Sequence, residues 1–281
     1  MLSIVTALLP LALAGTPNTV TLSSMTEQDG IAVLDQELLA ASYESLITEL
    51  GAGIAQPATH PARTLGAGEW EITLSQQFLF IEARLRDGPS PWERSHPDES
   101  PPNFLTIPTL EAHIGLPLSA EVSFRTGWIA GSDTGVVGGS ARVAILEGYQ
   151  PLPDFAIRFG YGAYVGNDEL ELGTTDISLM LGTTNEVGHN RAFTSARVSP
   201  WASYSWLGIH ASPILDEQTA NAIGAVSYTK DSEDINAPGP IKTTQIGAGL
   251  RVAARGVHVT IGVNWSPDGL PAATAGMGLL F

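Results

Sequence analysis

Apolar residues alternate with polar or small ones along the C-terminal part of the chain. From Val257 to Trp265 every second residue is apolar, and the alternation resumes at Ala273 and ends on Phe281. A period of two residues predicts β-strands whose two faces meet unlike environments. We therefore expect these segments to form two neighbouring antiparallel strands, apolar on one face and polar or small on the other.

The same alternation recurs from Glu69 onward and predicts ten strands in all. The other eight runs lie at about 70–80, 110–114, 121–128, 142–145, 155–165, 176–181, 197–210 and 245–255. This spacing favours an all-β fold, an antiparallel transmembrane β-barrel of about ten strands over residues 69–281. An eleventh run at 221–229 leaves twelve strands as the alternative, since bacterial barrels hold even numbers of strands.

The lengths of the connecting segments predict an orientation. Bacterial membrane barrels have short periplasmic turns and longer external loops. Counting back from Phe281 places the short segments 116–117, 150–154 and 255–256 in the periplasm, and the long segments 87–103 and 211–240 outside. Segment 183–196 fits poorly, because it would be a long periplasmic turn.

The N-terminal part differs from the rest of the chain. Residues 1–14 form an apolar run that ends in Ala-Leu-Ala, which predicts a secretory signal peptide, although no Lys or Arg precedes the run. Residues 15–68 then contain a leader, an amphipathic helix at about 28–54 and a linker. The helix carries five carboxylates and no cation: Asp29, Asp35, Glu37, Glu44 and Glu49.

Composition narrows the classes of function. The net charge is −16 with only two lysines, which argues against a nucleic-acid partner because such binding depends on Lys and Arg. The chain has no cysteine, so it has no disulfide and no thiolate chemistry. Aromatic residues are expected near the membrane boundaries, where indoles concentrate: Trp70, Trp92, Trp128, Tyr149, Trp201, Trp206 and Trp265.

With an exported leader and a closing strand that ends on Phe281, residues 69–281 resemble the outer-membrane β-barrels of Gram-negative bacteria. The resemblance implies an outer-membrane location, lipid around the barrel, and recognition of Phe281 by the barrel-assembly machinery. The layout of leader, N-terminal segment and barrel is also loosely similar to outer-membrane fatty-acid transporters, which implies transport. A soluble exported β-sandwich is the alternative fold.

If the apolar faces meet lipid, the opposite faces line the lumen. The charged residues on those faces are candidate lumen-lining groups: Glu71, Glu111, His113, Glu121, Arg125, Arg142, Arg158, Asp176, Arg251 and Arg255. Arginines and carboxylates in a narrow interior should pair, and the favoured interpretation is a self-neutralising polar core. The alternative is an arginine-lined path for a small solute.

The acidic helix would act as a plug if its carboxylates met these arginines, although a helix about 10 Å across is large for this lumen. The helix could instead pack below the barrel or bind a periplasmic partner.

Motifs for catalysis or metal binding are absent from the sequence. The paired aspartates and Asp–His couple of outer-membrane proteases are missing, as is the Gly-x-Ser-x-Gly elbow of hydrolases. No His-x-x-x-His pair occurs, so we expect no catalytic residue, no cofactor and no metal. The sequence therefore predicts a small channel or transporter for small solutes or apolar ligands. The alternative is a non-conducting barrel that acts through its acidic external loops.

Overall fold

A computed structural model describes residues 18–28, 31–32, 35–56, 58–81, 84–85, 88–96, 103–149, 152–187, 196–225 and 240–281. The predicted signal peptide 1–14 lies outside these residues and stays a prediction. Among the described helices, none has both the length and the apolar character needed to cross a membrane.

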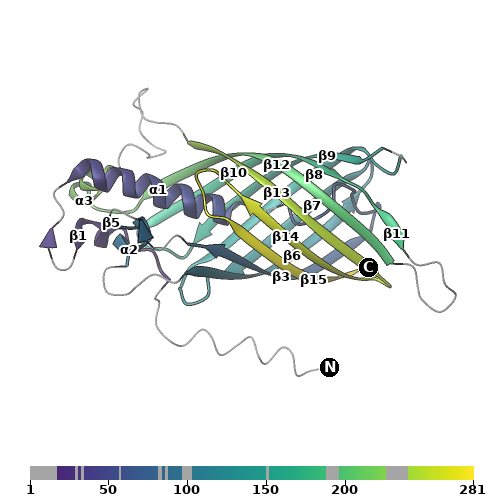
Figure 1. Ribbon diagram of the computed structural model, residues 1–281, viewed down its shortest axis with the longest axis horizontal. Coiled ribbons are helices and arrows are strands. Elements are labelled where there is room, and N and C mark those ends of the chain that lie inside the picture. The colour runs from purple at the N-terminus through teal and green to yellow at the C-terminus, as the bar shows by residue number, and fades with distance from the viewer. Residues whose placement is uncertain are drawn as a thin grey trace, which may run out of the picture.

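Ten antiparallel strands form a closed barrel (Figure 1). They are β3 (Trp70–Phe80), β6 (Phe104–Leu116), β7 (Ala120–Trp128), β8 (Gly135–Leu146), β9 (Asp154–Val165), β10 (Leu170–Gly182), β12 (Ala196–Pro213), β13 (Ile241–Ala254), β14 (Val257–Trp265) and β15 (Ala272–Leu280). Each strand pairs with its neighbour in sequence, and β15 pairs with β3 to close the ring. The prediction of ten strands is confirmed, and the twelve-strand alternative is wrong.

The C-terminal residue takes part in the closure. The backbone of Phe281 exchanges two hydrogen bonds with that of Trp70, with N–O distances of 2.9 and 3.2 Å. Their rings stack with centroids 4.2 Å apart. Next to them, Leu279 of β15 lies opposite Ile72 of β3. The closing strand predicted from the alternation is therefore the strand that completes the barrel.

The two faces of each strand differ as the alternation predicted. On β14, Val257, Val259 and Ile261 are exposed on the outer surface, whereas His258 and Thr260 are buried inside. An apolar outer surface with a polar interior is the arrangement of barrels that span membranes. This arrangement contradicts the soluble β-sandwich alternative.

The connections divide the barrel into two ends. The turn end holds both Trp70 and Phe281 and the connections 117–119, 147–153, 183–195 and 255–256. The loop end holds the connections 81–103, 129–134, 166–169, 214–240 and 266–271. Part of segment 183–196 is a strand, since β11 (Asn185–Val187) pairs with the start of β12. Residues 188–195 lie outside the described residues.

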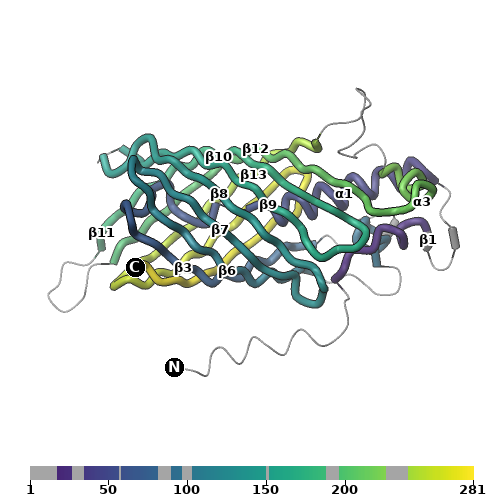
Figure 2. The backbone as a smooth tube through the Cα atoms, turned by 180° about the vertical axis from the view of Figure 1, so that it is seen from behind, coloured from purple at the N-terminus to yellow at the C-terminus, as the bar shows by residue number. Residues whose placement is uncertain are grey.

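The N-terminal segment enters the barrel at the loop end and crosses the lumen to the turn end (Figures 1 and 2). It begins with η3 (Ser23–Thr26) and a hairpin of β1 (Glu27–Gln28) and β2 (Ile31–Ala32). Helix α1 (Gln36–Ile54) follows and its C-terminal end lies inside the barrel. The predicted helix therefore starts later than expected, because β1 and β2 occupy its first residues and Asp35 caps α1.

A hydrophobic core fills the loop end of the lumen around α1. Tyr43, Leu46, Ile47, Leu50 and Ile54 are fully buried against the inner wall of the barrel. Two short helices from the loops, α2 (Pro91–Arg94) and α3 (Glu217–Ala222), complete this core, while β4 (Arg84–Leu85) and β5 (Gly88–Pro89) form a small hairpin nearby. Helix α3 contains part of the run predicted as an eleventh strand; residues 226–229 of that run lie outside the described residues.

Helix α3 is capped by an exposed aspartate. The backbone amide and hydroxyl of Thr219 both donate to Asp216, which lowers the pKa of that carboxyl.

Two of the tryptophans expected at the membrane boundaries are buried instead. Trp92 of α2 packs into the core and donates to Glu49 of α1 at 2.6 Å. Trp201 of β12 lies inside the barrel near Gly247 and Gly249. The alternation of β12 places Trp201 on the same lumen face as Ser203 and Ser205, and the facing glycines leave room there for its indole.

Candidate functional site

The C-terminal end of α1 is held by side chains of the barrel wall. Gln245 donates to the carbonyl of Ala52 at 3.3 Å, Gln77 to that of Gly53 at 2.9 Å, and Arg125 to that of Ile54 at 2.6 Å. The last carbonyls of a helix have no partner within the helix and carry the negative end of its dipole. The wall therefore supplies donors and a positive charge where the helix lacks them.

The linker after α1 is held in the same way. Arg158 donates to the carbonyl of Gln56 at 2.7 Å and also pairs with Asp176 at 3.0 Å. Arg142 donates to the carbonyl of Pro61 at 2.5 Å. Three arginines of the wall thus bind backbone carbonyls of the segment that crosses the lumen.

Of the three placements left open for the helix, the structure has the C-terminal end of α1 inside the barrel, but the carboxylate–arginine contacts on which the plug interpretation depended are not found among the described residues. Two of the helix carboxylates have other roles, since Asp35 caps the helix and Glu49 accepts from Trp92, and Glu37 and Glu44 are exposed. Asp29 lies outside the described residues. The arginines bind carbonyls because only the C-terminal end of α1 enters the polar half of the lumen.

Below the helix, six side chains form a buried group that we call the His–Glu cluster: His60, Glu71, Glu111, His113, Glu121 and His258. His60 comes from the linker and the other five from β3, β6, β7 and β14. On Glu71, His60 Nε2 lies 2.6 Å from Oε1 and His258 Nε2 lies 3.4 Å from the same oxygen. Arg251 bonds the other oxygen of Glu71.

The second half of the cluster is built around His113. Its Nδ1 lies 3.0 Å from Glu121 and its Nε2 lies 3.4 Å from Glu111. Glu121 also accepts from Arg142 at 2.6 Å and from the backbone amide of Leu65 at 3.0 Å. The rings of His113 and His60 are 4.0 Å apart. The cluster thus joins the linker to four strands through one continuous hydrogen-bond network.

Opposite charges nearly balance in this network. Glu71 meets the guanidinium of Arg251 and Glu121 meets that of Arg142, while Glu111 contacts His113. Both ring nitrogens of His113 face a carboxylate, an arrangement that a protonated ring satisfies fully. Buried charges need such partners, since an unpaired charge in the interior costs several kcal/mol. Such pairs are what a self-neutralising polar core requires, and that interpretation stays a prediction.

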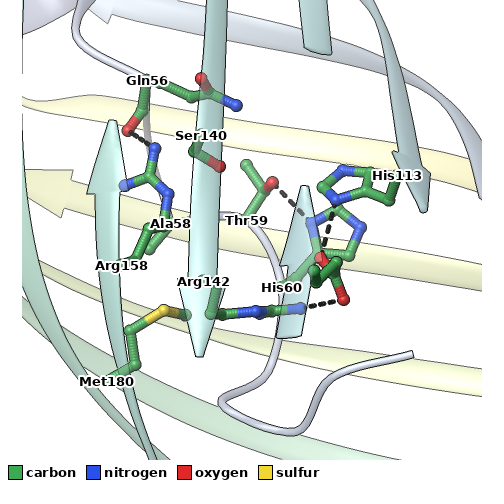
Figure 3. A pocket seen from close by; sticks show the side chains of 10 residues that line it. Gln56, Ala58, Thr59, His60, His113, Ser140, Arg142, Arg158 and Met180 are labelled. Carbon is green, nitrogen blue, oxygen red and sulfur yellow. Dashed lines mark hydrogen bonds and ion pairs between the residues drawn. The ribbon is translucent and has the colours of Figure 1, made fainter. Parts of the chain in front are cut away.

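One array within the cluster has the connectivity of a catalytic triad. The hydroxyl of Thr59 lies 2.9 Å from His60 Nδ1, and His60 Nε2 lies 2.6 Å from Glu71. However, the cavity beside it measures about 10 Å³, room for about one water molecule (Figure 3). A substrate does not fit beside the hydroxyl in this arrangement.

Nine of the ten predicted lumen-lining residues lie inside the barrel. Eight are buried and Arg251 is half-buried beside Glu71. Arg255 is different: it lies in the turn between β13 and β14 with a φ of 52°, and its side chain is exposed. The prediction for Arg255 is wrong because β13 ends at Ala254 and the backbone reverses at Arg255, so the alternation of the strand no longer applies there. Whether any of these residues lines a solute path stays a prediction.

His60 was not among the predicted site residues. It lies in a linker without periodicity, so no pattern indicated which wall residues it would meet. His258 was predicted to face the lumen, but its partners Glu71 and His60 are far away in sequence. The cluster forms only when β14 closes near β3 and the linker passes between them.

A second hollow lies on the lipid-facing wall of the barrel. It has a volume of about 650 Å³ and spans β9, β10, β12 and β13. Its lining includes Phe159, Ile177 and Trp206, which are about half exposed, with Lys242 and Pro240 among the others. The missing side chain of Gly208 leaves room in this surface, since an added Cβ there would lie beside Thr175 and Pro240. An acyl chain of the surrounding lipid would meet this surface.

Comparison with known proteins finds solved β-barrels of low sequence identity. No protein-family model matches the chain, and no curated protein does. Among solved structures, the N-terminal β-barrel domain of Pseudomonas aeruginosa OprF is 13% identical, with 77% of this chain and all of that domain covered and a TM-score of 0.31. The β domain of the Bordetella autotransporter BrkA is 10% identical, with 75% and 98% covered and a TM-score of 0.39.

A further match has a broader coverage of this chain. The translocator domain of the autotransporter NalP from Neisseria meningitidis is 10% identical, with 88% of this chain and 98% of that domain covered and a TM-score of 0.32. At these identities and TM-scores the matches add no argument, and the fold rests on the closed ring of ten strands with its apolar outer face.

Proposed function

We propose that this protein is an outer-membrane barrel closed by its own N-terminal segment, and that it acts through the surface at its loop end. The observation that carries the proposal is the path of the N-terminal segment through the lumen. Residues 36–56 and 58–64 lie along it from the loop end towards the turn end, and the cavity beside the His–Glu cluster is only about 10 Å³. A hydrated solute needs far more room than one water molecule.

The loops at the loop end are held in place by packing and hydrogen bonds. Its core of α1, α2, α3 and wall residues is well packed, and the leader is bonded to three different loops. Asn18 donates to the carbonyl of Ala130, Ser23 donates to Glu169, and Thr21 donates to the carbonyl of Ser95. By the rule that long loops face outward, this surface is the external one, and it would present a fixed shape to a partner.

Electrical recordings in planar bilayers test the proposal. The intact protein should be silent, whereas a variant that lacks residues 18–64 should conduct steadily, because the lumen is then empty. Heat-modifiable migration on detergent gels and β-rich circular dichroism must first establish that both proteins are folded. Steady conductance of the intact protein at the level of the deletion variant would overturn the proposal.

A gated channel is the second candidate, and one observation favours it. The turn-end half of the lumen is lined by charged and polar groups, and its contacts with the linker are hydrogen bonds that water can replace. Displacement of the linker would open a polar path. Brief, repeated openings of the intact protein would favour this candidate over a permanently closed barrel.

A further inference from the structure

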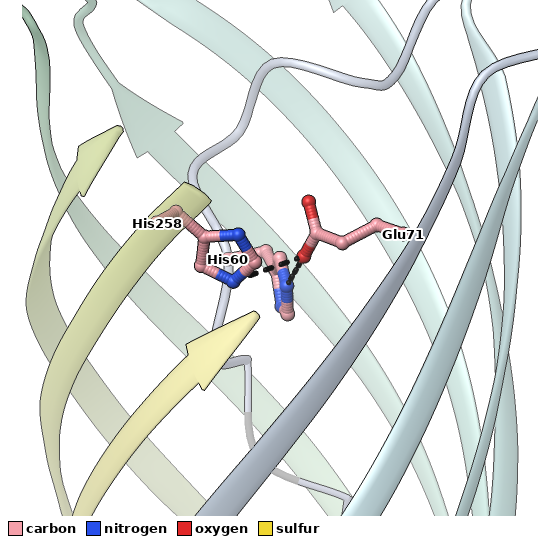
Figure 4. Close-up of side chains that lie close together, drawn as sticks. All are labelled: His60, Glu71 and His258. Carbon is pink, nitrogen blue, oxygen red and sulfur yellow. Dashed lines mark hydrogen bonds and ion pairs between the residues drawn. The ribbon is translucent and has the colours of Figure 1, made fainter. Parts of the chain in front are cut away.

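We infer that His60, Glu71 and His258 form a binding site for one divalent ion of the zinc class, and that the ion fastens the plug to the barrel wall. The three side chains come from the linker, β3 and β14, and all are at least nine-tenths buried. Their ligand atoms lie within 4.8 Å of one another (Figure 4). This inference rests on the proposed function only for the role of the ion in holding the plug.

The donor set matches the chemistry of such an ion. Two imidazole nitrogens and one carboxylate oxygen are common ligands of zinc, at bonds of about 2.0–2.2 Å. Both Nε2 atoms point to the same oxygen of Glu71, at 2.6 and 3.4 Å. Small side-chain movements would place an ion between the three atoms. The hydroxyl of Thr73 lies 3.1 Å from His258 Nε2 and 3.1 Å from Glu71 Oε1, on the rim of the same space.

The surrounding groups hold two of the three ligands, His60 and Glu71, as metal sites require. Metal-binding histidines usually donate their other ring nitrogen to an acceptor, and ligating carboxylates are hydrogen-bonded in turn. His60 Nδ1 lies 2.9 Å from the hydroxyl of Thr59, and Arg251 bonds the second oxygen of Glu71. His258 Nδ1 is buried and has no hydrogen-bond partner among the described residues. The ring of His258 is therefore oriented through its Nε2, at the proposed site.

A neighbouring group of donors is less suitable. His60, Glu111 and His113 also lie within 4.8 Å of one another. However, His113 contacts a carboxylate at each nitrogen, the arrangement of a protonated ring, and this ring would have to lose a proton before it could bind an ion. At the group that contains His258, the ion would take the place of the 2.6 and 3.4 Å contacts of His60 and His258 with Glu71, and the Thr73 hydroxyl would be rearranged. The geometry therefore favours the group that contains His258.

Zinc binding to the full chain tests the inference. The protein, without a polyhistidine tag, is refolded in detergent with ZnCl₂, since the site is buried, and then dialysed before its metal content is measured. We expect one zinc per chain. His60→Gln, Glu71→Gln and His258→Gln should each lower the affinity at least tenfold in a chelator competition. Cobalt refolded into the intact protein should give the visible absorption of a tetrahedral site, which His258→Gln should remove.

Two further variants identify the site. His210→Gln changes an exposed histidine of β12 and should bind zinc as the intact protein does. His113→Gln separates the two groups of donors and should change the affinity less than threefold. Loss of zinc in His113→Gln but not in His258→Gln would overturn the assignment, as would an intact protein that retains no zinc. Heat-modifiable migration of each variant excludes failure to fold.

The role of the ion is measured separately from its binding. Zinc should raise the temperature at which the intact protein loses its compact gel mobility, and should leave that of His258→Gln unchanged. A silent barrel that binds no zinc overturns this inference and leaves the proposed function intact. A barrel that binds zinc but conducts steadily overturns the proposed function and leaves the site.

Discussion

Individual arginines in this barrel act on the backbone of the plug. A guanidinium has five donors in a fixed plane, so Arg158 can bind Asp176 and the carbonyl of Gln56 together. The sequence predicted pairs between these arginines and carboxylates of the wall, and carboxylates on α1 were expected partners only if the helix were a plug. The carbonyls could not be predicted as partners, because every residue has one and nothing in the sequence marks those that lie at a helix end inside a barrel.

Arg125 offers a test at this scale. Arg125→Met keeps much of the side-chain volume but leaves the buried carbonyl of Ile54 without its donor. We expect the variant to lose about 1.5–3 kcal/mol of unfolding free energy, the usual range for hydrogen bonds with charged groups. Guanidinium unfolding in detergent micelles measures this loss.

The matched control for Arg125 is Arg63→Met. The side chain of Arg63 is 46% exposed and lies 3.6 Å from Glu147. Exposed ion pairs contribute less than about 1 kcal/mol, so this variant should unfold almost as the intact protein does. Equal midpoints for the two variants would contradict the role given to Arg125.

At the scale of elements, the strands were predictable and their inner packing was not. Alternation identified all ten strands because each one has lipid on one face and the lumen on the other. It could not show that β12 places Trp201 over glycines of β13 and β14. A Cβ at Gly249 would lie 2.3 Å from Trp201 Cζ2 and 2.5 Å from the carbonyl of Ile261.

Gly249→Ala should therefore destabilise the barrel. Overpacking of this kind costs about 1–3 kcal/mol, because neither the indole nor the neighbouring backbone can move away easily. Gly173→Ala in β10 is the control, since its added Cβ would meet no atom closer than 3.7 Å. Thermal unfolding of the two variants side by side gives the comparison, and a Gly249→Ala protein as stable as Gly173→Ala would refute the packing argument.

The His–Glu cluster was unpredictable at the scale of elements for a related reason. Glu71, Glu111, His113 and Glu121 were assigned to the lumen by the face of their strands. Their meeting point depends on how the linker crosses the lumen, and the linker sequence 55–65 has no periodicity that indicates a path. His60 could be placed only by the folded barrel.

At the scale of the whole molecule, the apolar outer surface leads to a prediction about introduced charges. The deeper in the membrane a charged side chain lies, the more it should lower the free energy of unfolding. Ile261 is 54% exposed near the middle of β14, whereas Val257 begins the same strand at the turn end. Ile261→Arg should destabilise the barrel by about 2–4 kcal/mol in lipid, and Val257→Arg by about 0–1 kcal/mol. Unfolding in phospholipid vesicles measures both; equal costs would mean that this face does not meet the membrane interior.

The path of the N-terminal segment also constrains the order of assembly. Asn18 is bonded at one mouth of the barrel and Trp70 begins the first wall strand at the other, so the chain is threaded through the ring that its own later residues close. The pairing of β3 with β15 joins the two ends of the wall and is the most remote contact in sequence, which makes it slow to form. Either the N-terminal segment is inside the barrel before β3 pairs with β15, or it must pass through a barrel that is already closed. Assembly of this barrel is therefore a problem of topology as well as of energy.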